Sequence, residues 1–156
     1  MSKTSKIIII FIFIGLLTSC GFKKIAQYES LINLQKITIN GDNRISYKLK
    51  NNIKLISSET AQKRYNVIVD LTQKKIGKIK DSAGRVTRYA VTFNAELNLE
   101  NESNQEIVNK SFTKSANYYV ASSHSETINN EKNAVKIIIQ QISEDIKKFI
   151  LSVDRN

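Results

Sequence analysis

Residues 89–99 read YAVTFNAELNL, with an apolar side chain at every odd position. The intervening positions carry polar groups, among them Thr92, Asn94, Glu96 and Asn98. Alternation with a period of two is typical of a strand that packs one face on a core and exposes the other face to water. The stretch therefore predicts a half-buried strand in an antiparallel sheet.

A second strand precedes this one and a third follows it. The apolar residues of the preceding strand are Val67, Val69, Leu71, Ile76 and Ile79. Residues 81–84, DSAG, favour a turn, so Tyr65 to Glu100 is predicted to form one long hairpin. After a further turn cluster at residues 101–104, Ile107 to Tyr119 is predicted to add the third strand.

The amino-terminal part of the domain is predicted to contain a strand and then a helix. The strand runs from Leu31 to Ile39 and ends at a turn that includes Asp42. Its apolar face is formed by Leu31, Ile37 and Ile39. The helical period that follows places Ile45, Leu49, Ile53 and Ile56 on one stripe. Asp42 or Asn43 is placed to cap this helix, and residues 57–63 predict a loop.

The carboxyl-terminal residues predict a second, longer helix. Ser123 and Glu126 have the spacing of a capping box. Apolar residues then recur in steps of three and four, at Val135, Ile139, Ile142, Ile146, Phe149 and Val153. A stripe of this kind needs an apolar surface to cover, and the predicted sheet supplies one.

These elements predict a fold of the α+β class. Their order is strand, helix, three strands, helix. Two amphipathic helices and one half-buried sheet bury each other most simply as a two-layer sandwich. We therefore expect residues 31–156 to form a single domain, in which two helices pack on a four-stranded, mostly antiparallel sheet.

The first 30 residues indicate export. Lys3 and Lys6 precede an apolar run from Ile7 to Leu17, and small residues lead into Cys20. The pattern resembles a bacterial lipoprotein signal, in which residues 1–19 are removed and the cysteine is acylated, leaving residues 20–30 as a lipidated tether. Two alternatives stay open: a secretory signal with a chance cysteine, and a transmembrane helix, for which roughly 18 apolar residues are needed.

The charge of the chain favours anionic partners. Without the two lysines of the predicted signal, 22 basic and 14 acidic residues remain, a formal net charge of +8. Lipid head groups and the phosphates of lipopolysaccharide (LPS) are the expected partners of such a protein, and export argues against nucleic acid. The alternative is a solvated lysine surface without a ligand. Because Cys20 is the only cysteine, no intramolecular disulfide is expected.

Four short passages behind Cys20 point to a known family. They are Gly21-Phe22, TING at residues 38–41, LKNN at residues 49–52, and KSANY at residues 114–118, ahead of the last helix. In these passages and in its element order, nearly the whole mature chain resembles the LPS-assembly lipoprotein LptE family.

This resemblance implies a lipid-anchored protein on the periplasmic side of the outer membrane. Gly21, which is not an aspartate, is consistent with sorting to that membrane. Members of the family plug and help to assemble a β-barrel, LptD, and have affinity for LPS. The resemblance implies no catalysis and no cofactor.

Basic residues gather at the tip of the predicted hairpin. They are Lys74, Lys75, Lys78, Lys80, Arg85 and Arg88. Antiparallel pairing is expected to bring them close together, and lysine and arginine suit phosphate oxygens, so we expect this tip to bind LPS or another anionic lipid. The alternative is that these lysines protect the strands from edge-to-edge aggregation.

Other functions find little support in the sequence. His124 is the only histidine, so neither a transition-metal site nor a Cys-His pair is predicted. No set of residues supplies a nucleophile, a base and an oxyanion donor, and we expect no enzyme. The alternative to the LptE-like function is another periplasmic adaptor, such as a secretin pilotin or an auxiliary lipoprotein of an ABC transporter.

Overall fold

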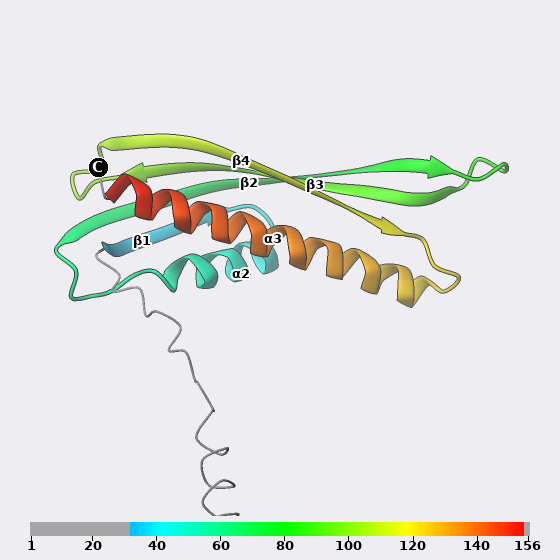
Figure 1. The fold of residues 1–156 in the computed structure, drawn as a ribbon, viewed down its shortest axis with the longest axis horizontal. Helices are drawn as coiled ribbons and strands as arrows, with labels where there is room; N and C mark the ends of the chain where they lie inside the picture. Colours follow the sequence, from blue (N-terminus) through cyan, green and yellow to red (C-terminus); the bar gives the residue numbers. More distant parts are fainter. Residues whose placement is uncertain (1–31, 155–156) are drawn as a thin grey trace, which may run out of the picture.

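The computed structural model describes residues 32–154 (Figure 1). The predicted signal, Cys20 and the tether lie outside the described residues. The elements are β1 (Ile32–Asn40), α2 (Asn43–Lys54), β2 (Lys63–Lys80), β3 (Val86–Glu100), β4 (Glu106–Tyr119) and α3 (His124–Asp154). This order confirms the predicted one.

The four strands form one mixed sheet in the order β1-β2-β3-β4. The pairs β2–β3 and β3–β4 are antiparallel, whereas β1 and β2 are parallel. Parallel neighbours need a crossover connection, and α2 provides it. The predicted α+β class, with two helices on a mostly antiparallel sheet, is confirmed.

The odd-numbered side chains of β3 form the centre of the core. Val91, Phe93, Ala95, Leu97 and Leu99 are each at most 1% exposed. Leu97 pairs with Val69 of β2, and both side chains are fully buried. Both helices lie on this one side of the sheet (Figure 1). We call the side of the sheet away from the helices, where the even-numbered side chains of β3 lie, the outer face.

β1 differs from the prediction in the face that it buries. The buried residues are Ile32, Leu34 and Ile37, so the alternation changes phase within the strand. Leu34 pairs with Tyr65 and Lys36 pairs with Asn66, which leaves Gln35 as an extra residue in a bulge. A bulge reverses the inward and outward positions beyond it. Of the predicted face, Ile37 is buried and Ile39 packs against the core, whereas Leu31 lies outside the described residues.

α2 begins at a cap formed by Asp42, one of the two predicted candidates. Its Oδ1 accepts hydrogen bonds from the backbone N–H groups of Arg44 and Ile45, each 3.1 Å long. The helix buries Leu49 and Ile53 and ends at Lys54. It does not extend to Ile56, but that side chain still packs against the core from the loop.

α3 buries a wider face than the predicted stripe. Ile138 and Ile150 are fully buried although the prediction left them out, whereas Val135, Phe149 and Val153 are only partly buried. The reason is that α3 packs on α2 as well as on β3 and β4. At the amino end, Ser123 Oγ accepts a hydrogen bond from the Glu126 backbone N–H at 3.1 Å, as a capping box requires.

On β2 the β2–β3 hairpin extends beyond the residues that the core buries, whereas on β3 Ala90 and Val91 are still buried. Leu71 is the last buried residue of β2, and every later residue of the strand is exposed. In Figure 1 this end of the hairpin projects past the other elements at the right of the view. We call residues 72–92 the distal hairpin.

A polar cluster fastens the base of the distal hairpin to α3 and β4. Lys75 Nζ and the Tyr118 hydroxyl both donate to Glu131 Oε2, at 2.8 and 2.9 Å. The same ammonium lies 4.8 Å from the ring centroid of Tyr89 and 5.3 Å from that of Tyr118. These two rings stack with their centroids 5.5 Å apart. The cluster thus joins β2, β3, β4 and α3.

The ionisation of this cluster is tuned by its own hydrogen bonds. Burial alone raises the pKa of Glu131, but the bonds from Lys75 and Tyr118 outweigh it and hold that pKa below 4.5. Burial alone lowers the pKa of Lys75, but its bonds to Glu131 and Tyr118 raise that pKa above 10.5. Burial, followed by the contacts with Glu131, raises the pKa of Tyr118 above 10.0.

Replacing Gly41 by alanine should destabilise the fold. Gly41 has a φ of +145°, and an added Cβ would lie 2.7 Å from the backbone oxygen of Leu71. The strain and the clash together should lower the free energy of unfolding by about 2–3 kcal/mol, measured by urea denaturation. Gly84→Ala is the matched control, because Gly84 also has a positive φ but no atom within 4 Å of an added Cβ. Equal losses in both variants would contradict the assignment of the clash.

Glu131→Gln should cost roughly 1 kcal/mol of stability near neutral pH, since the ion pair is partly exposed and therefore partly screened. The lowered pKa of Glu131 means that its contribution is present above pH 4.5 and is lost as the pH falls through its folded-state pKa. The raised pKa of Lys75 means that its contribution is present below pH 10.5 and is lost at higher pH. Urea denaturation at several pH values should show the wild-type advantage over the variant only between these limits. An advantage that persists in strong acid would contradict the account.

Candidate functional site

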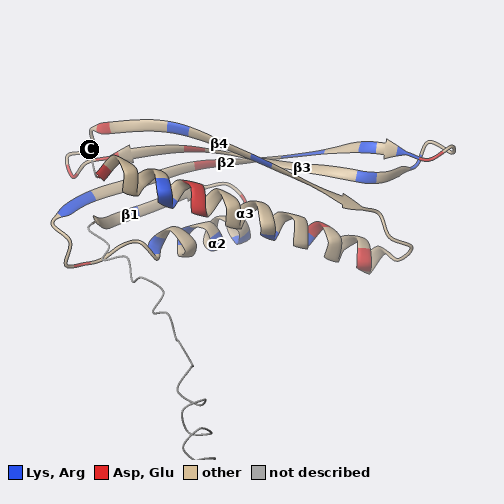
Figure 2. Cartoon of the chain, viewed as in Figure 1, with Lys and Arg blue, Asp and Glu red and all other residues tan. Residues whose placement is uncertain are grey.

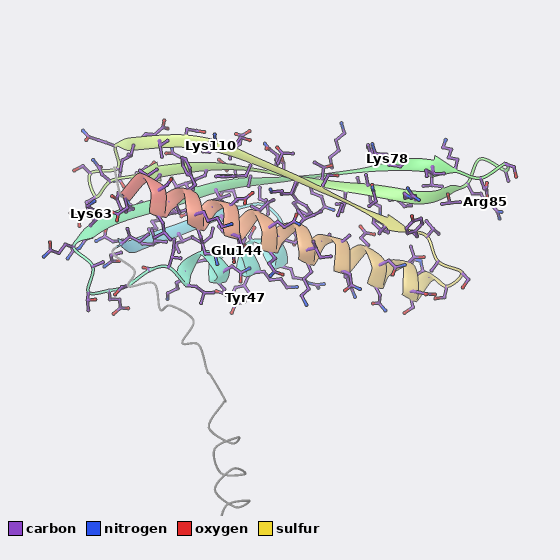
Figure 3. The ribbon with its side chains drawn as sticks, viewed as in Figure 1. Tyr47, Lys63, Lys78, Arg85, Lys110 and Glu144 are labelled. Carbon is purple, nitrogen blue, oxygen red and sulfur yellow. The ribbon has the colours of Figure 1, made fainter. Side chains whose placement is uncertain are left out.

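The distal hairpin is the candidate functional site, since it combines basic and apolar side chains outside the core. β2 and β3 remain paired out to Lys80 and Val86. Figure 2 shows lysine and arginine on both strands near this end, and Figure 3 labels Lys78 and Arg85 there.

Asp81 organises the turn at the tip. Its Oδ1 accepts from the backbone N–H groups of Ala83 and Arg85, both at 2.9 Å, and its Oδ2 accepts from the Arg85 side chain at 2.8 Å. The backbone bond from Arg85 is the main cause that lowers the pKa of Asp81 below 3.8. Gly84 takes the left-handed conformation that closes the turn, with a φ of 79°. The tip is therefore a defined turn.

Two bulges just before the turn decide which side chains reach the outer face. Gly77 pairs with Tyr89, whereas Ile79 pairs with Arg88, so Lys78 is an extra residue on β2. Thr87 is the corresponding extra residue on β3, because Lys80 pairs with Val86. Paired residues share a face, so the first bulge turns Ile79 toward the outer face.

The structure separates the six basic residues that the sequence analysis grouped. Lys75 lies on the helix side and is held by Glu131. Arg85 pairs with Asp81 inside the turn. Arg88 lies on the outer face with its guanidinium 4.4 Å from the ring centroid of Tyr119, and it donates to the hydroxyl of that residue. These three cations are therefore already engaged within the protein.

The other three basic residues remain available to a ligand. Lys74, Lys78 and Lys80 are exposed, and within residues 32–154 none of them forms an ion pair. Lys74 pairs in register with Thr92, which places it on the outer face. We call these three residues the distal lysines.

Four exposed apolar side chains accompany the distal lysines. They are Ile76, Ile79, Tyr119 and Val120, with exposed fractions of 40%, 43%, 59% and 40%. Ile79 and Tyr119 both pair with Arg88, and Ile76 pairs with Ala90 two residues further along β3, so these three side chains share the outer face. We call the four residues the distal apolar patch.

The sequence predicts that Ile76 and Ile79 lie in a strand, but not that their side chains are exposed. The only signal for the bulge that exposes Ile79 is Gly77, whose added Cβ would lie 2.9 Å from Val86 Cγ2. Tyr118 and Tyr119 are adjacent residues at the end of β4. The structure gives each a different place, because Tyr118 is 3% exposed and belongs to the core.

Within residues 32–154, no group of three or more histidine, cysteine, aspartate or glutamate side chains is placed to hold a metal ion. No helix in this part of the chain has both the length and the hydropathy needed to cross a membrane. What the distal hairpin does present is a set of unpaired cations beside apolar surface.

Comparisons with known proteins relate this fold to lipoproteins of Gram-negative bacteria. No family model and no curated protein sequence matches the chain. The rare lipoprotein B of Shewanella oneidensis is similar in structure, with a TM-score of 0.61 and 11% identity, over 78% of this chain and 96% of that one. A minor lipoprotein of Acinetobacter baumannii has a TM-score of 0.57 and 15% identity, over 77% and 90% of the two chains. The chain thus shares the fold of these lipoproteins.

Proposed function

We propose that this protein is a non-enzymatic lipoprotein of LPS assembly. In this proposal Cys20 carries the lipid anchor, the domain lies on the periplasmic side of the outer membrane, and the partner is the β-barrel LptD. The observation that carries the proposal is the distal hairpin, where three unpaired lysines lie beside four exposed apolar side chains. The fold shared with bacterial lipoproteins supports the anchor.

The distal hairpin suits an amphiphile that has both phosphates and acyl chains. Ammonium groups form charge-assisted hydrogen bonds with phosphate oxygens, and the distal lysines are not neutralised by neighbouring carboxylates within residues 32–154. Ile76 and Ile79 offer apolar surface a few residues away on the same strand. LPS carries both kinds of group on one molecule.

The outer face of the sheet is polar, as expected for a surface that contacts the polar interior of a β-barrel. Asn94 Oδ1 accepts hydrogen bonds from Ser111 at 2.7 Å and from Thr113 at 2.9 Å, and Thr92 donates to Ser115 at 3.0 Å. This produces an ordered layer of uncharged polar groups that no described element covers. The interiors of outer-membrane barrels are polar, so such a face is chemically compatible with one.

Charge reversal of the distal lysines should weaken LPS binding. The triple variant Lys74→Glu, Lys78→Glu, Lys80→Glu should lose at least about tenfold in affinity, because attraction to the phosphates is replaced by repulsion. The measurement is thermophoresis of the purified protein with fluorescently labelled LPS. The control variant Lys50→Glu, Lys54→Glu, Lys148→Glu has the same change in net charge at exposed positions on the two helices. If both triple variants lose affinity equally, the distal hairpin is not the binding site.

The partner can be identified by co-purification. Tagged, acylated protein should bring down one large β-barrel at comparable abundance from native outer membranes in mild detergent, as judged by mass spectrometry. Cys20→Ala removes the anchor while leaving every described residue unchanged, and it should reduce recovery from the membrane fraction. Recovery of a secretin or of a transporter component would instead support one of the other adaptor functions.

A further inference from the structure

A second surface with a defined shape lies on the helix side of the molecule. A groove with a volume of about 1030 Å³ runs between α2 and residues 128–147 of α3. Ile45, Leu55, Ile128 and Val135 contribute apolar surface to its lining. Leu55, at the carboxyl end of α2, is 76% exposed.

Two rows of cations flank this groove. Arg44 and Lys48 lie one turn apart on α2, and Lys132 and Lys136 lie one turn apart on α3. All four are exposed, and within residues 32–154 none forms an ion pair. Like charges at this spacing destabilise a helix. We call these residues the groove cations.

The carboxylates that line the groove do not neutralise the groove cations. Asp42 is occupied as the cap of α2, and Glu131 is held by Lys75 and Tyr118. Glu144, labelled in Figure 3 on α3, is paired with Lys147 at 2.6 Å. The groove therefore presents net positive charge on both sides of an apolar strip.

We propose that this groove binds an acidic amphipathic helix of a partner protein. α2 has 12 residues and is about 18 Å long, so a helix lying along it would place its apolar positions over Ile45, Leu55 and Val135. Acidic residues on both flanks of such a helix would meet the two rows of groove cations. A single phosphate head group fits less well, because the cations follow the groove walls and do not converge on one point.

This inference goes beyond the proposed function and does not depend on it. The groove cations and the distal lysines are different residues on different elements. Charge reversal of the distal lysines tests LPS binding, and charge reversal of the groove cations tests peptide binding. Either proposal can therefore fail while the other holds.

The test uses synthetic peptides as probes. A small panel of helical peptides of about 18 residues, with leucine along one face and glutamate on both flanks, is titrated against the full-length protein in detergent by fluorescence anisotropy. Two double variants are compared, Lys132→Glu with Lys136→Glu and Arg44→Glu with Lys48→Glu. Each should weaken peptide binding about tenfold or more. The control is the double variant Lys74→Glu with Lys78→Glu, which changes the net charge by the same amount. It should weaken peptide binding by less than about threefold.

An apolar pair of variants separates docking from simple charge attraction. Leu55→Ala should weaken peptide binding, whereas Ile137→Ala should not, because Ile137 is 52% exposed on α3 but does not line the groove. The proposal is overturned if no peptide of the panel binds, or if all charge variants behave alike. It is also overturned if vesicles of phosphatidylglycerol bind with the same dependence on the groove cations and displace the peptide, because the site would then be a lipid site.

Discussion

The burial of one face of β3 is the constraint on which the other elements depend. Val91, Phe93 and Leu97 lie in the middle of the sheet, and each is worth about 1.5–3 kcal/mol when removed from water. That face needs a cover, and α3 supplies most of it with Ile138, Ile142 and Ile146. α2 covers the β1 side and, as the crossover between β1 and β2, makes that pair parallel. The opposite face of β3 stays polar because nothing in the described chain packs on it.

The same hairpin is divided into a structural half and an exposed half. Up to Leu71, β2 contributes to the core, and beyond it the strand continues without cover from the helices. Lys75 lies at the boundary, where its ion pair with Glu131 ties the exposed half to α3. Lys75, which the sequence groups with the candidate LPS-binding residues, therefore stabilises the fold. This attachment also leaves the distal lysines, Ile76 and Ile79 as the part of the hairpin free to meet a ligand.

Sequence patterns predicted the elements well and the surfaces less well. The period of β3 and the cap of α2 depend on neighbouring residues. The period was predicted correctly, and the cap is Asp42, one of the two predicted candidates. The bulge at Gln35, the burial of Ile138 and the exposure of Ile79 depend on register with other strands or helices, which a single sequence does not record. The engagement of Lys75, Arg85 and Arg88 was missed for the same reason, since Glu131 lies 56 residues from Lys75 along the chain. The groove was also missed, because two helices far apart in sequence form its walls.

We propose that the exposed end of the β2–β3 hairpin is where this protein binds LPS, and photo-crosslinking tests that proposal most directly. A photoreactive residue at Ile79, which is 43% exposed, reports on the outer face near the distal lysines. One at Ile137, which is 52% exposed, reports on α3. In living cells of the native organism, irradiation should link position 79 to LPS and leave position 137 unlinked. Equal labelling at the two positions, or labelling only at 137, would contradict the account.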